Sequence, residues 1–532
     1  EPIAILKYDF TPESKKLKVS ATMLYRFGKN GYTALDWYDA PDPRPDYYRN
    51  LPSYFFMENS DYNRMNFMKY AWAKEAWTMD IPSITHINWD RLYAVNTLNT
   101  TEAGKRSKYV IEERRTDQQD LNFAANAKWS PLKYFTLTGG LSYKWNRTEN
   151  YKILDDLLGG DYYVNIDQFA ERDYAAMIQN DLDYYLQNGK AQTLKKGDKY
   201  GYDYYANVRR AEAWAAGRFT FAGLDASIAG RIGYTKFWRE GLVRKGLFPG
   251  LDANGAPMEF EGAEITTYDP ITKEAITSLG KSDVKDFLTG GVKLNLSYVI
   301  RGGHRVYADA AYVADAPRFN QAFVSPRTRN SIVPDLKTSK TFAADLNYAY
   351  SNSGYDVRVT GYYTTIKDQS KVMSFYDDAQ NSFTNFAMSG MDERHVGVEL
   401  GFKVPLPVPN LSLQGVLSYG QYVYTSNPVM YQTYDNSAAI VEETYGVTIP
   451  YWKSHPTAEG KTVKHYVSGT PQLATSLGLA WNKNYWFVDA DVDWFDKAYL
   501  DMNPLYRTDM ATAGPDGTVT PQEIEYMAAQ EK

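Results

Sequence analysis

Apolar and polar residues alternate along many segments of this chain, and the alternating segments come in pairs joined by a short turn. In the clearest pair, residues 121–129 and 135–145 carry an apolar or glycine position at every second residue. Successive side chains of a β-strand point to opposite faces, so this period of two predicts strands with one apolar and one polar face. We therefore expect each pair of segments to form a β-hairpin.

Seven such hairpins follow one another, which predicts fourteen strands. Besides the pair at 121–145, we expect hairpins near residues 3–27, 219–234, 288–312, 342–363, 396–419 and 473–494. One hairpin alone is equally compatible with an antiparallel sheet of a soluble protein. Seven in series are not, because a soluble sandwich has short connections at both ends of its strands. Here only alternate connections are short.

The long connections are expected at about residues 29–118, 149–210, 240–285, 315–337, 368–391 and 425–467. Short turns on one side and long loops on the other are typical of bacterial outer-membrane barrels, whose long loops lie outside the cell. The turns expected to face the periplasm are those at Pro131, Gly223, Gly302, Pro407 and Lys483. The loops expected to face outside are those around Arg44, Tyr184, Asn254 and Tyr434. The sequence thus predicts an all-β protein, a large antiparallel transmembrane β-barrel.

The apolar face of these strands is predicted to contact lipid. Mid-strand residues expected on that face are Val19, Leu141, Ile232, Leu294, Leu400 and Val488. The chain has no run of about 18 apolar residues, so the sequence predicts no transmembrane helix. It has 46 Tyr, 12 Trp and no Cys, which excludes disulfides and thiolate metal sites. A net charge of -6 argues against a nucleic-acid-binding surface.

The strand count has a consequence for the size of the barrel. The chain begins inside a predicted strand and ends, after Trp494, in a polar segment, whereas a closed barrel pairs its last strand with its first. We expect residues 1–532 to be one outer-membrane β-barrel domain that is partial, in a protein with about 22 strands. A lumen of that width must be plugged, and the plug and final strands are expected outside this chain. Alternatively, the first long connection contributes further strands.

One loop has the residue types of a ligand-binding surface. Aromatic and charged residues are concentrated there in a segment stiffened by four prolines, and rigid aromatics mixed with charges bind ligands with little loss of entropy. The substrate-binding candidates are Trp37, Tyr38, Asp39, Arg44, Tyr47, Tyr48 and Arg49. The alternative interpretation is an ordered cap that packs its own aromatic residues against one another.

The sequence predicts neither an enzyme nor a metal site, and we expect no cofactor. Five histidines, His86, His304, His395, His455 and His465, lie far apart and do not have the H-E-x-x-H spacing of zinc sites. Residues 516–523 match the second half of an EF-hand loop. However, Thr512 and Gly514 would stand at its first and third positions, where calcium requires oxygen donors such as carboxylates.

Four segments resemble a known family. Residues 34–49, 316–320 and 397–401, and residues 469–472 followed by 494–496, resemble the barrel of TonB-dependent receptors, in particular the SusC-related branch. The chain differs from that family in lacking a plug, a TonB box and a terminal aromatic strand. The resemblance implies active import of a nutrient across a Gram-negative outer membrane, but it does not name the nutrient. The aromatic and carboxylate-rich loops suit oligosaccharides or peptides, and the sequence does not choose between these two classes.

The resemblance also implies partners. These are the TonB, ExbB and ExbD proteins acting through a plug, a SusD-like surface lipoprotein over the loops, and the lipid and lipopolysaccharide of the outer membrane. Two other functions remain open from the residues alone. One is a passive porin-type channel, and the other is a soluble all-β protein that binds glycans.

Overall fold

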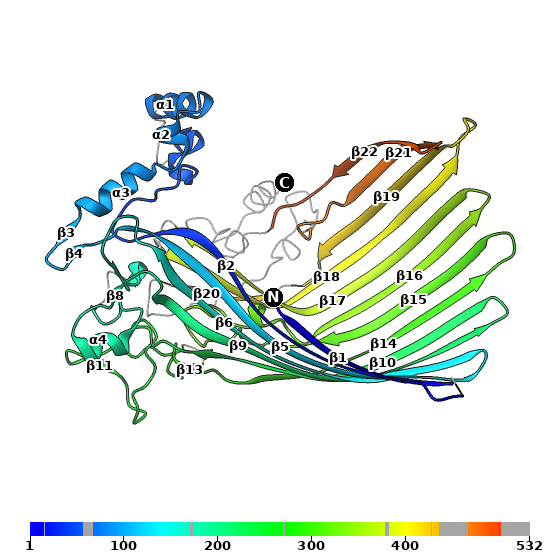
Figure 1. The fold of residues 1–532 in the computed structure, drawn as a ribbon, viewed down its shortest axis with the longest axis horizontal. Coiled ribbons are helices and arrows are strands. Elements are labelled where there is room, and N and C mark those ends of the chain that lie inside the picture. The colour runs from blue at the N-terminus through cyan, green and yellow to red at the C-terminus, as the bar shows by residue number, and fades with distance from the viewer. Residues whose placement is uncertain are drawn as a thin grey trace, which may run out of the picture.

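A computed structural model describes residues 1–14, 16–56, 67–170, 174–269, 272–377, 382–426, 428–435 and 466–501. Its main feature is one antiparallel sheet of 16 strands, most of which pair in chain order (Figure 1). The strands along this path are β1 (Ile3–Phe10), β2 (Leu17–Trp37), β5 (Tyr109–Leu132), β6 (Phe135–Asp156), β9 (Lys199–Phe221), β10 (Leu224–Gly241), β14 (Lys285–Val299), β15 (His304–Asp315), β16 (Ser339–Asn352), β17 (Tyr355–Asp377), β18 (Ser382–Pro405), β19 (Leu411–Tyr424), β21 (Leu473–Lys483) and β22 (Trp486–Asp496). Two short strands pair beside this path, β13 (Gly280–Lys281) on β10 and β20 (Val429–Tyr434) on β18.

The seven predicted hairpins are confirmed, and with them the fourteen strands. Each pair of segments forms two neighbouring antiparallel strands of the sheet. Three of the turns contain two residues, both with positive φ: Ala222 and Gly223, Ser353 and Gly354, and Asn484 and Tyr485. Such turns have the twist that matches two adjacent strands, which explains why these connections are so short.

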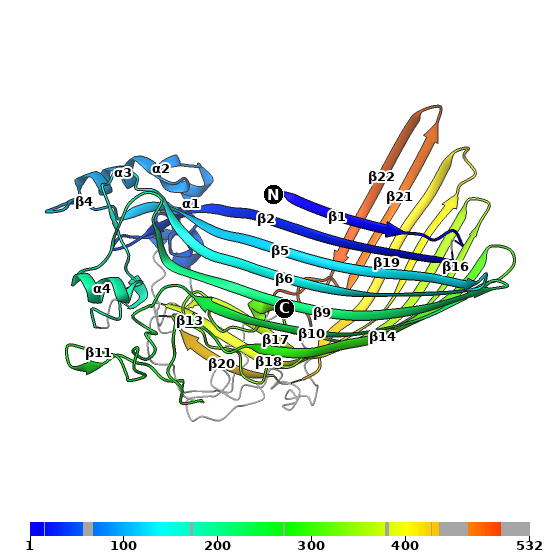
Figure 2. The same ribbon diagram turned by 60° about the horizontal axis from the view of Figure 1, so that its bottom comes forward.

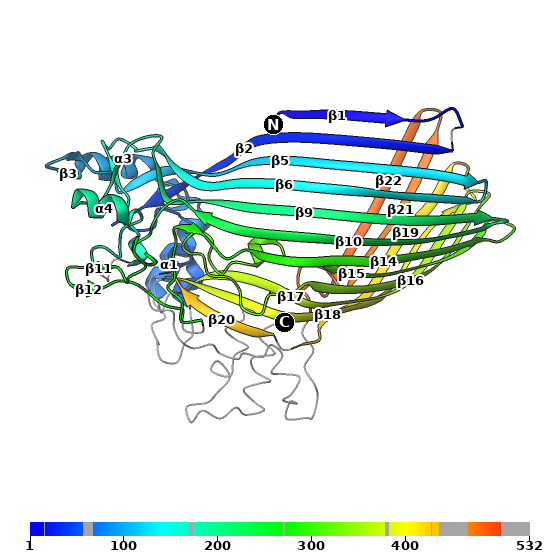
Figure 3. The same ribbon diagram turned by 90° about the horizontal axis from the view of Figure 1, so that it is seen from below.

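The sheet curves into a wide trough. Figures 2 and 3 show it bending from β1 through β10 and β14 and round to β22, with the short turns at one end and the long connections at the other. Among the described residues, β1 pairs only with β2 and β22 pairs only with β21. The sheet therefore has two open edges there.

Along the strands, apolar side chains are exposed and the polar side chains between them are buried, which is the reverse of the pattern in a soluble protein. In β14, the apolar Leu288, Leu296 and Tyr298 are 69%, 53% and 50% exposed, whereas the polar Thr289 and Ser297 are 3% and 2% exposed. The predicted lipid-facing residues Leu141, Ile232, Leu294 and Val488 are likewise exposed, and Val19 and Leu400 are partly exposed. An extended exposed apolar face with polar side chains on the other side is the arrangement of a barrel wall in a bilayer.

The strands continue further than predicted. β2 has 21 residues and β5 has 24, about twice the 9–11 that a tilted strand needs to cross a bilayer. The first connection is therefore shorter than the predicted 29–118, because β2 ends at Trp37 and β5 begins at Tyr109. The predicted loop at 368–391 is wrong. Most of it belongs to β17 and β18, which remain paired from Asp356 to Asp377 across two register shifts. The sequence shows little apolar alternation there, and alternation is expected only in the part of a strand that faces lipid.

The first connection does not add strands to the main sheet within its described part. It contains η1 (Tyr48–Asn50), η2 (Pro52–Phe56), α1 (Phe67–Thr78), α2 (Pro82–Thr85), α3 (Trp89–Leu98) and a hairpin of two-residue strands, β3 (Thr100–Thr101) and β4 (Gly104–Lys105). The alternative that this connection contributes further barrel strands is therefore wrong for its described residues. Pro82 at the start of α2 and Asn88 at the N-cap of α3 explain where these helices begin.

The other long connections are mostly irregular with short elements. They are β7 (Tyr163–Val164), η3 (Gln168–Ala170), α4 (Leu182–Asn188), β8 (Thr193–Leu194), β11 (Glu259–Phe260), β12 (Ala263–Glu264) and η4 (Phe319–Gln321). Across the described ranges, none of these helices has the length and apolar character to cross a membrane.

Buried apolar residues lie in small clusters at the loop end of the sheet. One contains Tyr38, Val110, Leu154, Leu194 and Tyr200, which come from the ends of four strands and from the connections between them. Another joins Phe237 of β10 to Phe323 beside η4. We call the described residues of the long connections, together with the strand ends that they cover, the cap. Its clusters hold the loops in fixed positions over the lumen side of the sheet.

Candidate functional site

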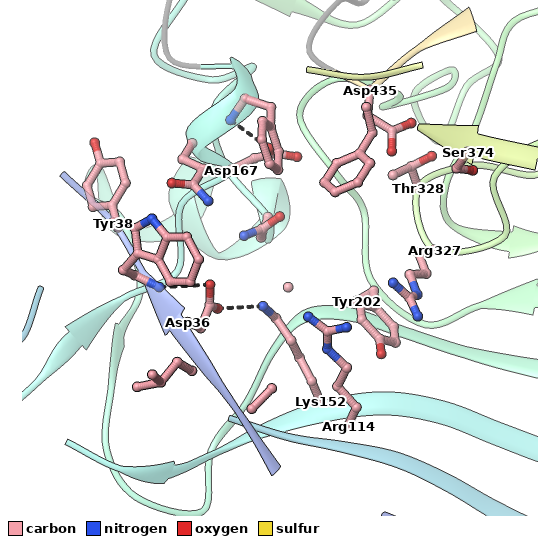
Figure 4. A pocket seen from close by; sticks show the side chains of 18 of the residues that line it. Asp36, Tyr38, Arg114, Lys152, Asp167, Tyr202, Arg327, Thr328, Ser374 and Asp435 are labelled. Atoms are coloured by element: carbon pink, nitrogen blue, oxygen red, sulfur yellow. Dashed lines mark hydrogen bonds and ion pairs between the residues drawn. The ribbon is translucent and has the colours of Figure 1, made fainter. Parts of the chain in front are cut away.

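A cavity of about 1790 Å³ lies within the cap (Figure 4). Its walls come from the loop ends of β2, β5, β6 and β9, from residues 41–49 of the first connection, and from residues 166–169, 320–328 and 383–385. A space of this size exceeds the roughly 300–1,000 Å³ of pockets for drug-sized molecules. It has room for an oligomeric ligand.

Six of the seven substrate-binding candidates line this cavity: Trp37, Tyr38, Arg44, Tyr47, Tyr48 and Arg49. Asp39 does not. Its backbone turns through a positive φ of 54°, and its carboxylate forms an ion pair with Lys108 at 2.9 Å. Asp39 thus joins the first connection to the start of β5, next to the cavity wall.

The aromatic loop also packs on itself. The guanidinium of Arg44 lies 5.3 Å from the centre of the Trp37 ring and forms an ion pair with Asp42 at 2.5 Å. Arg44 donates hydrogen bonds to the Asp42 carboxylate, and these bonds raise the pKa of Arg44 above its usual value. The rings of Tyr47 and Tyr48 meet edge to face at 4.9 Å. The ordered packing considered from the sequence is therefore formed by residues that also line the cavity.

A buried charge cluster forms the floor of the cavity. Lys152 of β6 donates to Asp36 of β2 and to Glu112 of β5, both at 2.8 Å. Tyr200 of β9 donates to the same Asp36 oxygen at 2.9 Å, and Arg114 contacts Glu112 at 2.5 Å. The cluster therefore crosses four neighbouring strands. The Glu112 side chain is fully buried and has both Lys152 and Arg114 as partners.

The environment of the cluster determines the pKa of its members. Burial opposes ionisation of Asp36, but the adjacent Lys152 ammonium and the hydrogen bonds outweigh burial and lower the pKa of Asp36. Burial likewise disfavours the charged form of Lys152, and the two carboxylates outweigh it, so the pKa of Lys152 is raised. Asp36, Glu112 and Lys152 all lie beyond the apolar part of their strands. Asp36 and Lys152 are thus both ionised near neutral pH.

The two sides of the cavity carry different charged groups, and Asp167 is paired with Lys245 at 3.4 Å. Figure 4 shows Asp36, Lys152, Arg114, Tyr202 and Arg327 on one side, with Asp167 and Asp435 across the cavity from them. Asp435 follows β20 and accepts a hydrogen bond from Asn385 at 2.8 Å. Burial raises the pKa of Asp435 above the ordinary aspartate value. The cavity can therefore present positive and negative groups to one ligand.

Sequence reasoning did not find the charge cluster or Arg327. Glu112, Arg114 and Lys152 lie in stretches predicted to be loop, far from one another in the chain. They meet because β5 and β6 extend beyond the bilayer and pair in register, with Arg114 opposite Lys152. The sequence has no strand period there: the charges at 112–115 are consecutive, and those of residues 149–156 fall at positions 149, 152, 155 and 156.

The described residues contain no group of three or more histidines or carboxylates arranged to hold a metal ion. His304 contacts the Tyr348 hydroxyl at 2.7 Å, and His395 contacts Glu393 at 3.0 Å, so both have structural partners. His455, His465 and the partial EF-hand at 516–523 lie outside the described residues.

Comparison of the sequence with protein-family models and with curated proteins finds no match. The solved structures with similarity include proteins named as transporters and import receptors. The copper transporter OprC has 12% identity and a TM-score of 0.49 over 92% of this chain and 52% of its own. The ferric-catecholate import receptor Fiu of E. coli K12 has 10% identity and a TM-score of 0.47 over 93% and 53%. The ferric citrate transporter FecA has 8% identity and a TM-score of 0.45 over 94% and 49%. The chain thus spans about half the length of these proteins.

Proposed function

We propose that this chain is the barrel part of a TonB-dependent importer in a Gram-negative outer membrane. The observation that carries the proposal is the combination of two features in one sheet. Its outer face is apolar and exposed along the strands, and its loop end encloses a large cavity lined by aromatic and charged residues. A lipid-facing sheet with a ligand-sized cavity at its loop end is the arrangement expected of a receptor that captures a nutrient outside the cell.

The width of the sheet supports active import over passive diffusion. Sixteen-stranded barrels already enclose a water-filled channel, and wider ones hold a plug. The two open edges of the described sheet require further pairing partners in a bilayer, because unpaired backbone groups in hydrocarbon are costly. We infer a barrel of about 22 strands, with residues 1–532 as a partial barrel domain and a plug that the TonB, ExbB and ExbD proteins move.

The cavity supports a nutrient of the oligosaccharide or peptide class. Aromatic rings such as Trp37 and Tyr48 suit the apolar faces of sugars and of side chains, while the ionised groups suit polar backbones. The SusC-related branch remains our proposal for the family. A SusD-like lipoprotein over the cap, and lipid with lipopolysaccharide around the wall, are the partners that this proposal includes.

The decisive experiment measures growth of the bacterium that carries the gene, with casein peptides or plant-derived oligosaccharides as sole carbon source. Strains with intact and deleted TonB are compared, each with and without the gene for this protein. We expect the gene to support growth only when TonB is intact. Gene-dependent growth that survives loss of TonB, together with a stable open conductance of the purified protein in planar bilayers, would instead establish a porin-type channel.

Orientation provides a second test. Epitope tags inserted at Asn254 in the cap and at Gly302 in the turn between β14 and β15 lie at opposite ends of the sheet. We expect antibody to label the Asn254 tag on intact cells and the Gly302 tag only after permeabilisation. Labelling at Gly302 on intact cells would reverse the topology.

A further inference from the structure

Arg327 is a cavity cation that lacks an acidic partner among the described residues. It lines the cavity, its side chain is exposed, and none of the ion pairs in the described part of the chain includes it. Its guanidinium lies 5.2 Å from the centre of the Tyr202 ring, which is a cation–π contact. This contact holds the side chain over the ring while its N–H donors remain available to a ligand.

The neighbouring charges do not neutralise it. Lys152 and Arg114 are balanced by Asp36 and Glu112, to which they are paired. Burial raises the pKa of Tyr202, and the positive charges of Arg327, Lys152 and Arg114 act on the phenol in the opposite direction. All three cations therefore lie close enough to Tyr202 for their charges to act on its pKa. Three positive and two negative groups leave an excess of one positive charge at this wall.

The turn that carries Arg327 is fixed by a buried arginine of β10. Arg239 is 2% exposed, and its guanidinium donates to the Pro326 carbonyl at 2.6 Å and to the Asn330 side chain at 2.5 Å. Within the turn, the Thr328 amide donates to the Ser325 carbonyl at 3.0 Å. The ends of the turn thus cannot move independently, and a guanidinium held in place loses less entropy on binding.

We propose that Arg327, supported by Tyr202 and Arg114, binds a carboxylate of the ligand. This inference rests on the proposed function and narrows its substrate class to acidic molecules. A guanidinium offers two parallel N–H groups that match the two oxygens of a carboxylate, and a neutral sugar hydroxyl cannot replace that charge-assisted pairing. Tyr202 supplies a hydroxyl donor at the same wall, and Arg114 belongs to the set of three cations and two carboxylates whose net charge is positive.

Two kinds of nutrient carry such a carboxylate, and the experiment separates them. One is a peptide with a free C-terminus, and the other is an oligosaccharide that contains uronic acids. Four probes are titrated calorimetrically into the full-length protein in detergent at low ionic strength: tetra-alanine, its C-terminal amide, trigalacturonic acid and the neutral maltotriose. We expect one of the two acidic probes to bind at least ten-fold more tightly than its neutral counterpart.

The Arg327→Gln variant should lose that ten-fold preference while retaining the affinity for the neutral probe. Arg305→Gln is the matched control, because Arg305 also lies 5.2 Å from a tyrosine ring, that of Tyr307, but does not line the cavity. It should leave the preference unchanged. Arg327→Lys, which keeps the charge without the planar fork, should retain part of the preference. Heat-modifiable mobility on gels verifies that each variant is folded.

The proposal is overturned if neither acidic probe binds the native protein more tightly than its neutral counterpart, or if Arg327→Gln and Arg305→Gln behave alike. Its failure is distinct from failure of the proposed function. Tight binding of maltotriose without any acidic preference, with growth that still requires TonB, would leave the importer intact and remove only the carboxylate site.

Discussion

Two regions of this molecule follow opposite rules of burial. One is the cap, and the other is the part of the sheet strands with exposed apolar side chains, which we call the wall. In the wall, apolar side chains such as Leu294 are exposed and pair across strands with other apolar residues, here Ile228 and Ala310. In the cap, apolar side chains such as Leu154 and Phe248 are fully buried, and charged groups such as Glu112 are buried with partners. The same strands participate in both regions.

The comparison teaches that surroundings, rather than strand pairing, determine which side chains a strand exposes. Hydrocarbon outside the wall makes apolar exposure favourable and leaves polar groups to the lumen. Water around the cap restores the usual hydrophobic effect, so apolar residues cluster and charges require compensation. The change occurs within single strands, such as β2, where apolar alternation ends near Phe27 and the ion-paired Asp36 follows.

The largest effect is expected from breaking the charge cluster of the cap. Lys152→Ala leaves Asp36 and Glu112 without their shared cation, and removal of one partner of a buried pair typically destabilises by about 3–5 kcal/mol. We expect local opening of the strand ends, measured as faster amide hydrogen exchange in the loop-end half of β6, while the wall half remains protected.

Lys144→Ala is the control on the same strand. Lys144 is half exposed and lies 3.9 Å from Asp120, so its loss should change stability by no more than about 1 kcal/mol. Equal exchange in both variants would mean that the buried cluster does not hold the cap together.

The wall should respond to charge on one face only. Leu294→Arg places a cation among Ile228 and Ala310 on the lipid side and is expected to destabilise by about 2–4 kcal/mol if residue 294 lies at the bilayer midplane. Asn295→Arg points to the polar side, where Asp309 accepts a hydrogen bond from Asn295 at 2.8 Å, and should be tolerated. Urea unfolding in lipid vesicles measures both. Similar losses would refute the assignment of the two faces.

The third effect concerns the support of the cavity wall. Arg239→Met keeps the volume of this buried side chain but removes its bonds to the Pro326 carbonyl and the Asn330 side chain, and bonds to a charged group contribute about 1.5–3 kcal/mol. We expect faster exchange in residues 325–330 and weaker binding of an acidic probe, although Arg239 does not line the cavity. Arg218→Met, which removes an exposed pair with Asp225, should alter neither.

The smallest effect is the dependence of the cap on pH. The pKa of Asp36 is lowered by Lys152, so its stabilisation is complete above the ordinary aspartate value of about 4 and is lost as pH falls through the lower folded value. The pKa of Lys152 is raised, so its stabilisation is complete below about 10.4 and is lost as pH rises through the folded value. Exchange at the strand ends near Lys152 should be flat between these limits.

Asp435 should have the opposite dependence. Because burial raises its pKa in the folded state, its contribution is greatest at acid pH and is lost as pH rises through that value. Exchange near β20 should therefore increase over a range in which exchange near Lys152 remains constant. A parallel response at the two sites would contradict the opposite pKa shifts of Asp36 and Asp435.

The membrane-facing strands could be predicted from the amino-acid sequence alone. A period of two is a local property of the chain. Alternate residues of a strand face lipid and lumen and therefore alternate between apolar and polar, so the hairpins at 121–145 and 473–494 could be predicted without a structure. The aromatic loop with Trp37, Arg44 and Tyr48 was also recognisable, because composition alone marks it as rigid and suited to binding.

The cavity and its charged groups could not be predicted in this way, because they form through contacts between distant parts of the chain. Beyond the bilayer, strand faces no longer separate lipid from water, so Glu112 and Lys152 give no alternating apolar signal although their strands continue. Asp36, Glu112, Lys152 and Tyr200 become neighbours through the register of four strands, and Arg327 reaches the same wall through a turn held by Arg239. Such contacts depend on long-range pairing, which no local stretch of sequence contains, because the partners are separated by as many as 164 positions.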